Sequence, residues 1–202
     1  GMHDKKIRLK AITKALGEVG LREIADRKVK KLSGGMLRRL GIAQALIHEP
    51  KVIIVDEPTV GLDPEERIRF RNVLSDLGLD RTVLLSTHIV ADLGGACKEI
   101  ALLDAGKVVF QGPPRELVQA ALGRVFQSSI TEAELDQFEE KYVLVSTHVA
   151  SNKIIVRGIA NKNEIPKNAE QVTEPTLEES YLAFMTVDLQ PKINCNKERI
   201  CN

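Results

Sequence analysis

The chain has 202 residues, 43% of them hydrophobic and 28% charged, which suits one globular domain or one domain with a small appendage. Its formal net charge of +1 argues against a protein that binds polyanions over its whole surface. Three cysteines are too few for a disulfide framework, and no run approaches the roughly 20 apolar residues of a membrane-spanning helix.

Residues 2–50 are expected to form a helical segment. Apolar residues recur on one helical face over 5–19, which predicts the first helix. A basic linker at 27–31 leads to Leu-Ser-Gly-Gly at 32–35, which opens a second helix that Pro50 ends. The positive charge here could face phosphates or acidic lipid, although a solvated helical face is the more ordinary explanation.

Residues 51–123 have the pattern of an α/β sheet with parallel strands. The run 52–55 is short, wholly apolar and β-branched, which is typical of a strand buried on both faces. Asp63 can cap a helix that begins at Pro64. A second apolar strand spans 82–86, and the order of strand, helix and strand predicts parallel pairing.

The remaining sequence predicts a smaller α+β arrangement. The runs 100–103 and 107–110, separated by an Ala-Gly turn, predict a β-hairpin. From 124 to 186, strand-like and helix-like stretches alternate in the manner of a small C-terminal α+β domain. Residues 187–202 have no apolar period, and we expect an irregular tail there.

Two carboxylates stand where the run 52–55 ends. In open α/β sheets, ligands bind beyond the carboxyl ends of the strands. Asp56 could therefore hold Mg²⁺ through water, and Glu57 could orient or deprotonate an attacking water. The alternative is an ordinary pair of acidic residues that caps the chain at a strand exit.

Two further features point to an anion. Ser33, Gly34 and Gly35 open a helix, where free backbone N–H groups and unbranched glycines favour anion binding. His88 follows the second strand and could donate a hydrogen bond to a terminal phosphate. Each has an ordinary alternative, since most Ser-Gly-Gly stretches are N-caps and most single histidines at strand ends are structural.

Four short sequences occur together in a fixed order. They are Leu-Ser-Gly-Gly-Met at 32–36, Val-Ile-Ile-Val-Asp-Glu-Pro at 52–58, Gly-Leu-Asp-Pro at 61–64 and Ser-Thr-His at 86–88. The set closely resembles the ABC ATPase family. The resemblance implies a partial P-loop NTPase sheet of the α/β class with a helical subdomain, followed by the small α+β appendage.

The resemblance implies which residues face a second ABC ATPase subunit. Ser33, Gly34 and Gly35 would form the signature motif, which clasps the γ-phosphate of ATP bound to the opposite subunit. Asp63 would lie in the D-loop, across the dimer interface.

It also implies a catalytic set, with ATP and Mg²⁺ as cofactors. Asp56 would be the Walker B acid that holds the metal, and Glu57 would be the catalytic base. His88 would be the switch histidine.

Further resemblance extends toward the end of the chain. The hairpin region 100–112 is similar to the one that follows the family's switch histidine. The stretch 174–185 resembles the ending of bacterial subunits that serve drug, antibiotic, sodium or polysaccharide exporters. The resemblance therefore implies a separate membrane permease as partner, and a cytoplasmic location at the inner face of the cell membrane.

The family's phosphate-binding loop, Gly-x-x-x-x-Gly-Lys-Ser/Thr, does not occur in these 202 residues. We therefore expect an N-terminally truncated subunit with negligible ATPase activity by itself, because phosphoryl transfer depends on positioned phosphates. One alternative is a non-catalytic module that lends its signature loop to an intact subunit. Another, a nucleic-acid-associated ABC ATPase, is disfavoured because no long heptad stretch and no tandem ATPase are visible, so no nucleic-acid partner is expected.

Overall fold

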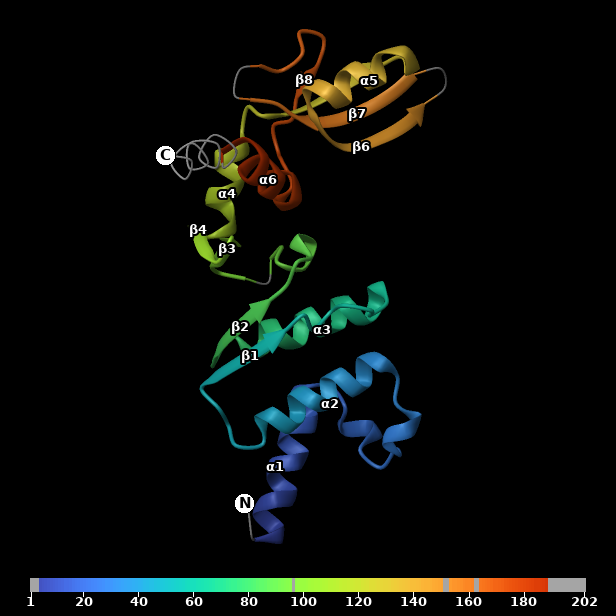
Figure 1. Ribbon diagram of the computed structural model, residues 1–202. Helices are drawn as coiled ribbons and strands as arrows, with labels where there is room; N and C mark the ends of the chain where they lie inside the picture. The colour runs from blue at the N-terminus through green and yellow to red at the C-terminus, as the bar shows by residue number, and fades with distance from the viewer. Residues whose placement is uncertain (1–3, 96, 151–152, 162–163, 189–202) are drawn as a thin grey trace, which may run out of the picture. The chain divides into compact units, whose positions relative to one another are not determined.

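A computed structural model of the chain describes residues 4–95, 97–150, 153–161 and 164–188. It divides into two compact units, Gly1–Ala96 and Cys97–Asn202, which are described separately (Figure 1). This division at 96/97 differs from the four segments expected from the sequence, so that functional division stays a prediction. In the described part of the chain, no helix is long and apolar enough to cross a membrane.

The first unit contains three capped α-helices. They are α1 (Lys5–Glu18), α2 (Gly34–Leu46) and α3 (Pro64–Leu77), with short 3₁₀ turns at Arg22–Ile24, Val29–Lys31 and Val90–Asp92. Each helix begins after a side chain that accepts a hydrogen bond from a backbone N–H of its first turn: Asp4, Ser33 and Asp63, respectively. Such caps satisfy N–H groups that have no partner within the helix. The helices predicted at 5–19, after 32–35 and after Pro64 are confirmed.

Two parallel strands complete the first unit. β1 (Val52–Asp56) pairs with β2 (Thr82–Ser86) in a register that sets Val52 opposite Thr82 and Asp56 opposite Ser86. Figure 1 shows α3 connecting the two strands, which is the crossover that parallel pairing requires. The predicted parallel α/β arrangement is therefore confirmed.

β1 is buried on one face only. Ile53 is 5% exposed and packs in the core that α1, α2 and α3 share, but Val52 and Ile54 are 56% and 73% exposed. Leu84 on β2 is also 59% exposed. The apolar pattern of 52–55 is typical of a strand covered on both faces, and the described residues supply that cover on one face of the pair.

The second unit begins with a β-hairpin, as predicted. β3 (Ile100–Asp104) and β4 (Lys107–Gly112) are antiparallel, with a register shift at Leu102/Leu103. Ala105 and Gly106 both have positive φ, 46° and 76°, which a two-residue turn of this hand requires.

A four-stranded antiparallel sheet follows in the order β6-β7-β5-β8. Its members are β5 (Val125–Ile130), β6 (Val143–Ala150), β7 (Lys153–Ile159) and the short β8 (Glu170–Gln171), which the sequence did not predict. Successive residues of β5 pack into different hydrophobic cores. Val125 packs with Ala121 and Ala183, whereas Phe126 packs with Phe138 of α5 (Glu132–Lys141). The predicted α+β domain is thus a sheet with apolar side chains on both faces.

The last described helices pack against the beginning of this unit. α4 (Pro114–Ala121) packs against α6 (Leu177–Ala183), and the rings of Phe110 and Phe184 lie 5.7 Å apart. These contacts explain why the hairpin and α4 group with the C-terminal sheet. An irregular tail was expected from residue 187 onward. Residues 187 and 188 belong to the π-helical turn Phe184–Asp188, and residues 189–202 lie outside the described residues.

We expect the isolated polypeptide to self-associate through the exposed face of β1 and β2. Leaving a large aliphatic side chain in water forgoes about 1.5–3 kcal/mol of burial. Replacing Ile54 with Lys should therefore shift the polypeptide toward monomer in analytical ultracentrifugation. The exposed Leu79→Lys, which lies off this face, is the control, and an equal shift for both variants would contradict the assignment.

In the second unit, we expect Glu179→Ala to lower the free energy of unfolding by about 2–4 kcal/mol. Glu179 is buried, and its carboxylate accepts hydrogen bonds from Arg157 Nε at 2.7 Å and Nη2 at 3.0 Å. It also accepts one from the backbone N–H of Thr176, closing a capping box. Urea unfolding measures the change. The exposed neighbour Glu178→Ala should change stability by less than about 0.5 kcal/mol.

Candidate functional site

The predicted acidic pair lies at the carboxyl end of β1. Asp56 is the last residue of the strand and Glu57 follows it. Asp56 is exposed, and its Oδ1 accepts a hydrogen bond from Ser86 Oγ, the side chain opposite it in the register. One carboxylate oxygen of Asp56 is therefore fixed by the neighbouring strand.

Glu57 has an unusual backbone and a divided carboxylate. Its φ of 45° lies in the left-handed region, while its N–H still donates to Ser86 O at 3.0 Å, as though the strand continued. Oε1 accepts the backbone N–H of His88 at 3.0 Å and lies 2.7 Å from His88 Nδ1. Oε2 is buried without a hydrogen-bond partner. The prediction that Glu57 and His88 share a site is consistent with these contacts.

Arg38 joins this site to α2. Its guanidinium donates to the carbonyl oxygens of Glu57, at 3.3 Å, and of Pro58 and Val60. An open cleft between α2 and the end of β1 is lined by Arg38, Gly41 and the acidic pair, among others. Hydrogen bonds from Arg38 thus fix the backbone around Glu57 to α2, the helix that begins at Ser33, Gly34 and Gly35, here called the signature segment.

A buried hydrogen bond braces the loop after Glu57. Thr59 Oγ1 donates to Asp92 Oδ2, and both residues are 1% exposed. Asp92 Oδ1 lies 3.9 Å from Arg67 Nε, too long for a hydrogen bond. The pair connects the segment after Glu57 with the turn that follows His88.

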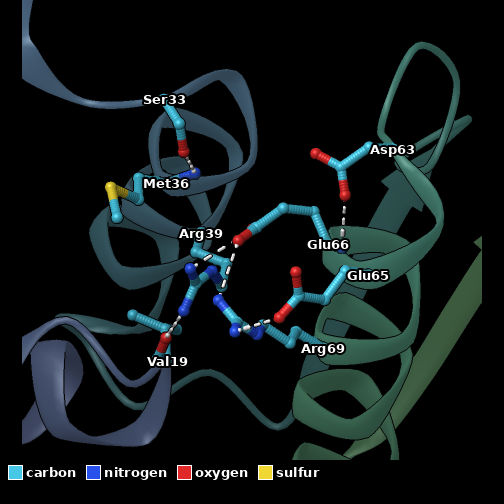
Figure 2. A network of polar contacts seen from close by, with 8 residues as sticks. All are labelled: Val19, Ser33, Met36, Arg39, Asp63, Glu65, Glu66 and Arg69. Carbon is cyan, nitrogen blue, oxygen red and sulfur yellow. Dashed lines mark hydrogen bonds and ion pairs between the residues drawn. The ribbon is translucent and has the colours of Figure 1, made fainter.

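Ser33 and Asp63 cap two helices whose beginnings are linked. Ser33 Oγ accepts the N–H of Met36 at 3.2 Å, and Asp63 Oδ1 accepts the N–H of Glu66 at 2.8 Å. Figure 2 shows Arg39 of α2 reaching Glu66 of α3 between them, with an Nη2–Oε2 distance of 3.3 Å. The N-cap alternative therefore describes Ser33 in this structure, and the helix cap predicted at Asp63 is confirmed. An anion role for the signature segment stays a prediction.

The predicted site residues thus fall into two groups of the first unit. One consists of Asp56, Glu57 and His88, and the other of Ser33, Gly34, Gly35 and Asp63. Sequence reasoning missed the residues that support both groups: Arg38, Arg39, Thr59, Glu66, Ser86 and Asp92. Only Ser86 could have been identified from the sequence. Asp56 and Ser86 are the last residues of two predicted parallel strands, and such residues lie side by side when the strands pair end to end.

The acidic pair fits a magnesium ion that also binds phosphates. Mg²⁺ keeps several waters and takes only one or two protein carboxylates in such sites. Asp56 offers an exposed carboxylate, and the buried Oε2 of Glu57 lacks the partner that a bound water would supply. No cluster of three or more His, Cys, Asp or Glu side chains that could hold a metal ion occurs among the described residues.

Comparison with known sequences finds similarity to ATP-binding proteins of ABC transporters. The model of the family described as "ABC transporter" matches residues 3–60. YxlF of Bacillus subtilis, an uncharacterized ABC transporter ATP-binding protein, is 37% identical over 141 residues, which cover 70% of this chain and 48% of that protein. Nod factor export ATP-binding protein I of Cupriavidus metallidurans is 40% identical over 113 residues, covering 55% of this chain and 37% of that protein.

Solved structures show the same likeness. cbiO1 of Clostridium perfringens, part of the ABC transporter complex cbiONQ, superposes with a TM-score of 0.54 at 32% identity, covering 58% of this chain and 48% of that one. The predicted ABC ATPase type of P-loop NTPase fold is therefore confirmed. The chain spans about half or less of the length of these relatives.

We expect Thr59→Val to lower the free energy of unfolding by about 1–3 kcal/mol, because it leaves the Asp92 carboxylate buried without its hydroxyl donor. Thr59→Ser keeps the hydroxyl and should recover most of the loss. Urea unfolding followed by circular dichroism provides the measurement. If Thr59→Val, which keeps the methyl group, is no less stable than Thr59→Ser, the hydrogen bond is not what stabilises this position.

Proposed function

Because this chain belongs to the ABC transporter family of ATP-binding proteins, we propose that it supplies one face of an ATP-hydrolysing site in an export transporter. The observation that carries the proposal is the Glu57 carboxylate. One of its oxygens is fixed by His88 and the other is buried without a partner, at the carboxyl end of a parallel strand pair. That is the edge at which α/β sheets bind ligands.

In this proposal Glu57 acts as the general base. His88 holds Oε1 through its backbone N–H and Nδ1, which fixes the orientation of the carboxylate that would accept the proton of the attacking water. Because a proton can pass only over hydrogen-bond distance, fixing one oxygen also limits where that water can lie. Asp56, steadied by Ser86, would hold Mg²⁺ through water, and the metal would neutralise charge on the phosphates of ATP.

The signature segment serves a second subunit in the same proposal. The first turn of α2 has N–H groups without carbonyl partners in the helix, and Gly34 and Gly35 add no side chain over them. Ser33, Gly34 and Gly35 would bind the γ-phosphate of ATP held by that subunit. Asp63, which caps α3 nearby in Figure 2, would lie at the same interface.

The transport context rests on the relatives. Several are named for Nod factor export, and cbiO1 is part of a transporter complex. We therefore propose an export permease as the membrane partner, with this chain bound peripherally at the cytoplasmic face and no nucleic acid involved.

The 202-residue polypeptide by itself should hydrolyse ATP negligibly, since it contains no Gly-x-x-x-x-Gly-Lys-Ser/Thr loop to position the phosphates. This property keeps a second candidate open. The chain could be a non-catalytic module whose complete Ser-Gly-Gly segment completes the site of an intact subunit.

Mixing the polypeptide with an intact family subunit, such as the Bacillus subtilis relative, tests the proposal. We expect a changed ATPase rate that Gly34→Asp removes, because a carboxylate repels the phosphate at the helix start. A stimulated rate that falls with Glu57→Gln would show that this carboxylate takes part in the assembled site and would contradict the non-catalytic module. An unaltered rate with Glu57→Gln supports that module, because the polypeptide has no loop to position phosphates before Glu57. No effect of the wild-type polypeptide contradicts both functions.

A further inference from the structure

The two glycines of the signature segment lie in different surroundings. A Cβ added at Gly34 would meet nothing within 4 Å. A Cβ added at Gly35 would lie 2.2 Å from Glu66 Oε2, 2.8 Å from its Cδ and 2.9 Å from its Cγ. The carboxylate of Glu66 therefore rests directly against the Cα of Gly35, and no side chain fits between α2 and α3 there.

Glu66 is not free to move aside. Its Oε2 accepts from Arg39 Nη2 at 3.3 Å and its Oε1 from Arg69 Nη1 at 3.2 Å, and its side chain is only 13% exposed (Figure 2). Arg39 is itself 7% exposed, and its Nη1 donates to Val19 O at the end of α1. Displacing the Glu66 carboxylate would leave a buried guanidinium without its anion, which is costly.

We propose that Glu66 is a positioning residue for the signature segment. It fills the space beside Gly35 and fixes the first turn of α2 relative to the first turn of α3. This inference rests on the proposed function, because it gives the fixed segment the task of meeting a phosphate. Glycine at position 35 is then required by a neighbour within the same chain, and not by the approach of the ligand alone.

The geometry links two elements of the proposed interface. The backbone N–H of Glu66 bonds to Asp63, while its carboxylate contacts Gly35 and Arg39. Glu66 therefore contacts Asp63 through its backbone and the signature segment through its side chain. A partner subunit would meet both as a single preformed surface, which lowers the ordering cost of association.

Amide hydrogen exchange on the whole polypeptide tests the positioning role without any partner. We expect Gly35→Ala to speed exchange in the peptide covering 33–38 by about tenfold or more relative to the peptide covering 70–77. Gly34→Ala should leave that ratio unchanged. If the two alanine variants behave alike, or if exchange rises uniformly across the unit, the proposal fails, and this comparison needs no Glu66 variant to fold.

Single variants distinguish packing from charge at Glu66. Glu66→Ala should speed exchange in the peptide covering 33–38, because it removes the side chain that fixes the first turn of α2, whereas Glu66→Gln keeps the size of that side chain and should change exchange much less. Glu65→Ala, which removes an exposed partner of the same Arg69, is the matched control and should change nothing in this peptide. Equal exchange in the Glu66→Ala and Glu65→Ala variants would overturn the positioning role.

A capture assay then tests the consequence for function. With ATP and an immobilised intact subunit, such as the Bacillus subtilis relative, Glu66→Ala should bind at least tenfold more weakly than Glu65→Ala, while Glu66→Gln binds nearly as the unaltered chain does. If the unaltered chain is not captured, the proposed function fails and the exchange result still decides the positioning role. If it is captured and all three variants bind equally, the positioning role is wrong.

Discussion

The register of β1 against β2 is the constraint on which the candidate site depends. It sets Asp56 opposite Ser86 and carries Glu57 far enough along the ladder for its N–H to reach Ser86 O. Two residues after Ser86, His88 then meets the Glu57 carboxylate. Because side chains alternate between the faces of a strand, a shift of one residue would separate these groups. The arrangement of the polar groups in the site therefore depends on how β1 and β2 pair along their mostly apolar length.

Elements governed by local chemistry could be predicted from the sequence. Asp63 followed by Pro64 specifies a helix start, and the apolar run before Asp56 specifies a strand, whatever lies elsewhere in the chain. The candidate acids and His88 could also be identified, because strand ends and short motifs can be recognised from the order of residues alone.

Long-range contacts could not be predicted in the same way. The pairing of Arg39 with Glu66 joins residues 27 positions apart, and that of Thr59 with Asp92 joins residues 33 apart, without any local pattern to announce them. The exposure of Val52 and Ile54 likewise depends on which distant residues cover the strand. An apolar strand indicates that it requires cover, but not whether a given stretch of chain supplies it.

The backbone conformation of Glu57 sets a cost against its proposed role. A residue with a Cβ at a φ of 45° carries a strain of about 1–3 kcal/mol, whereas Gly or Asn would occupy that conformation at lower cost. Positive φ alone does not mark a functional residue, since Glu49 has a φ of 49° and no proposed role. For a chain that does not need the Glu57 carboxylate, Gly or Asn at this position should therefore be the more stable choice.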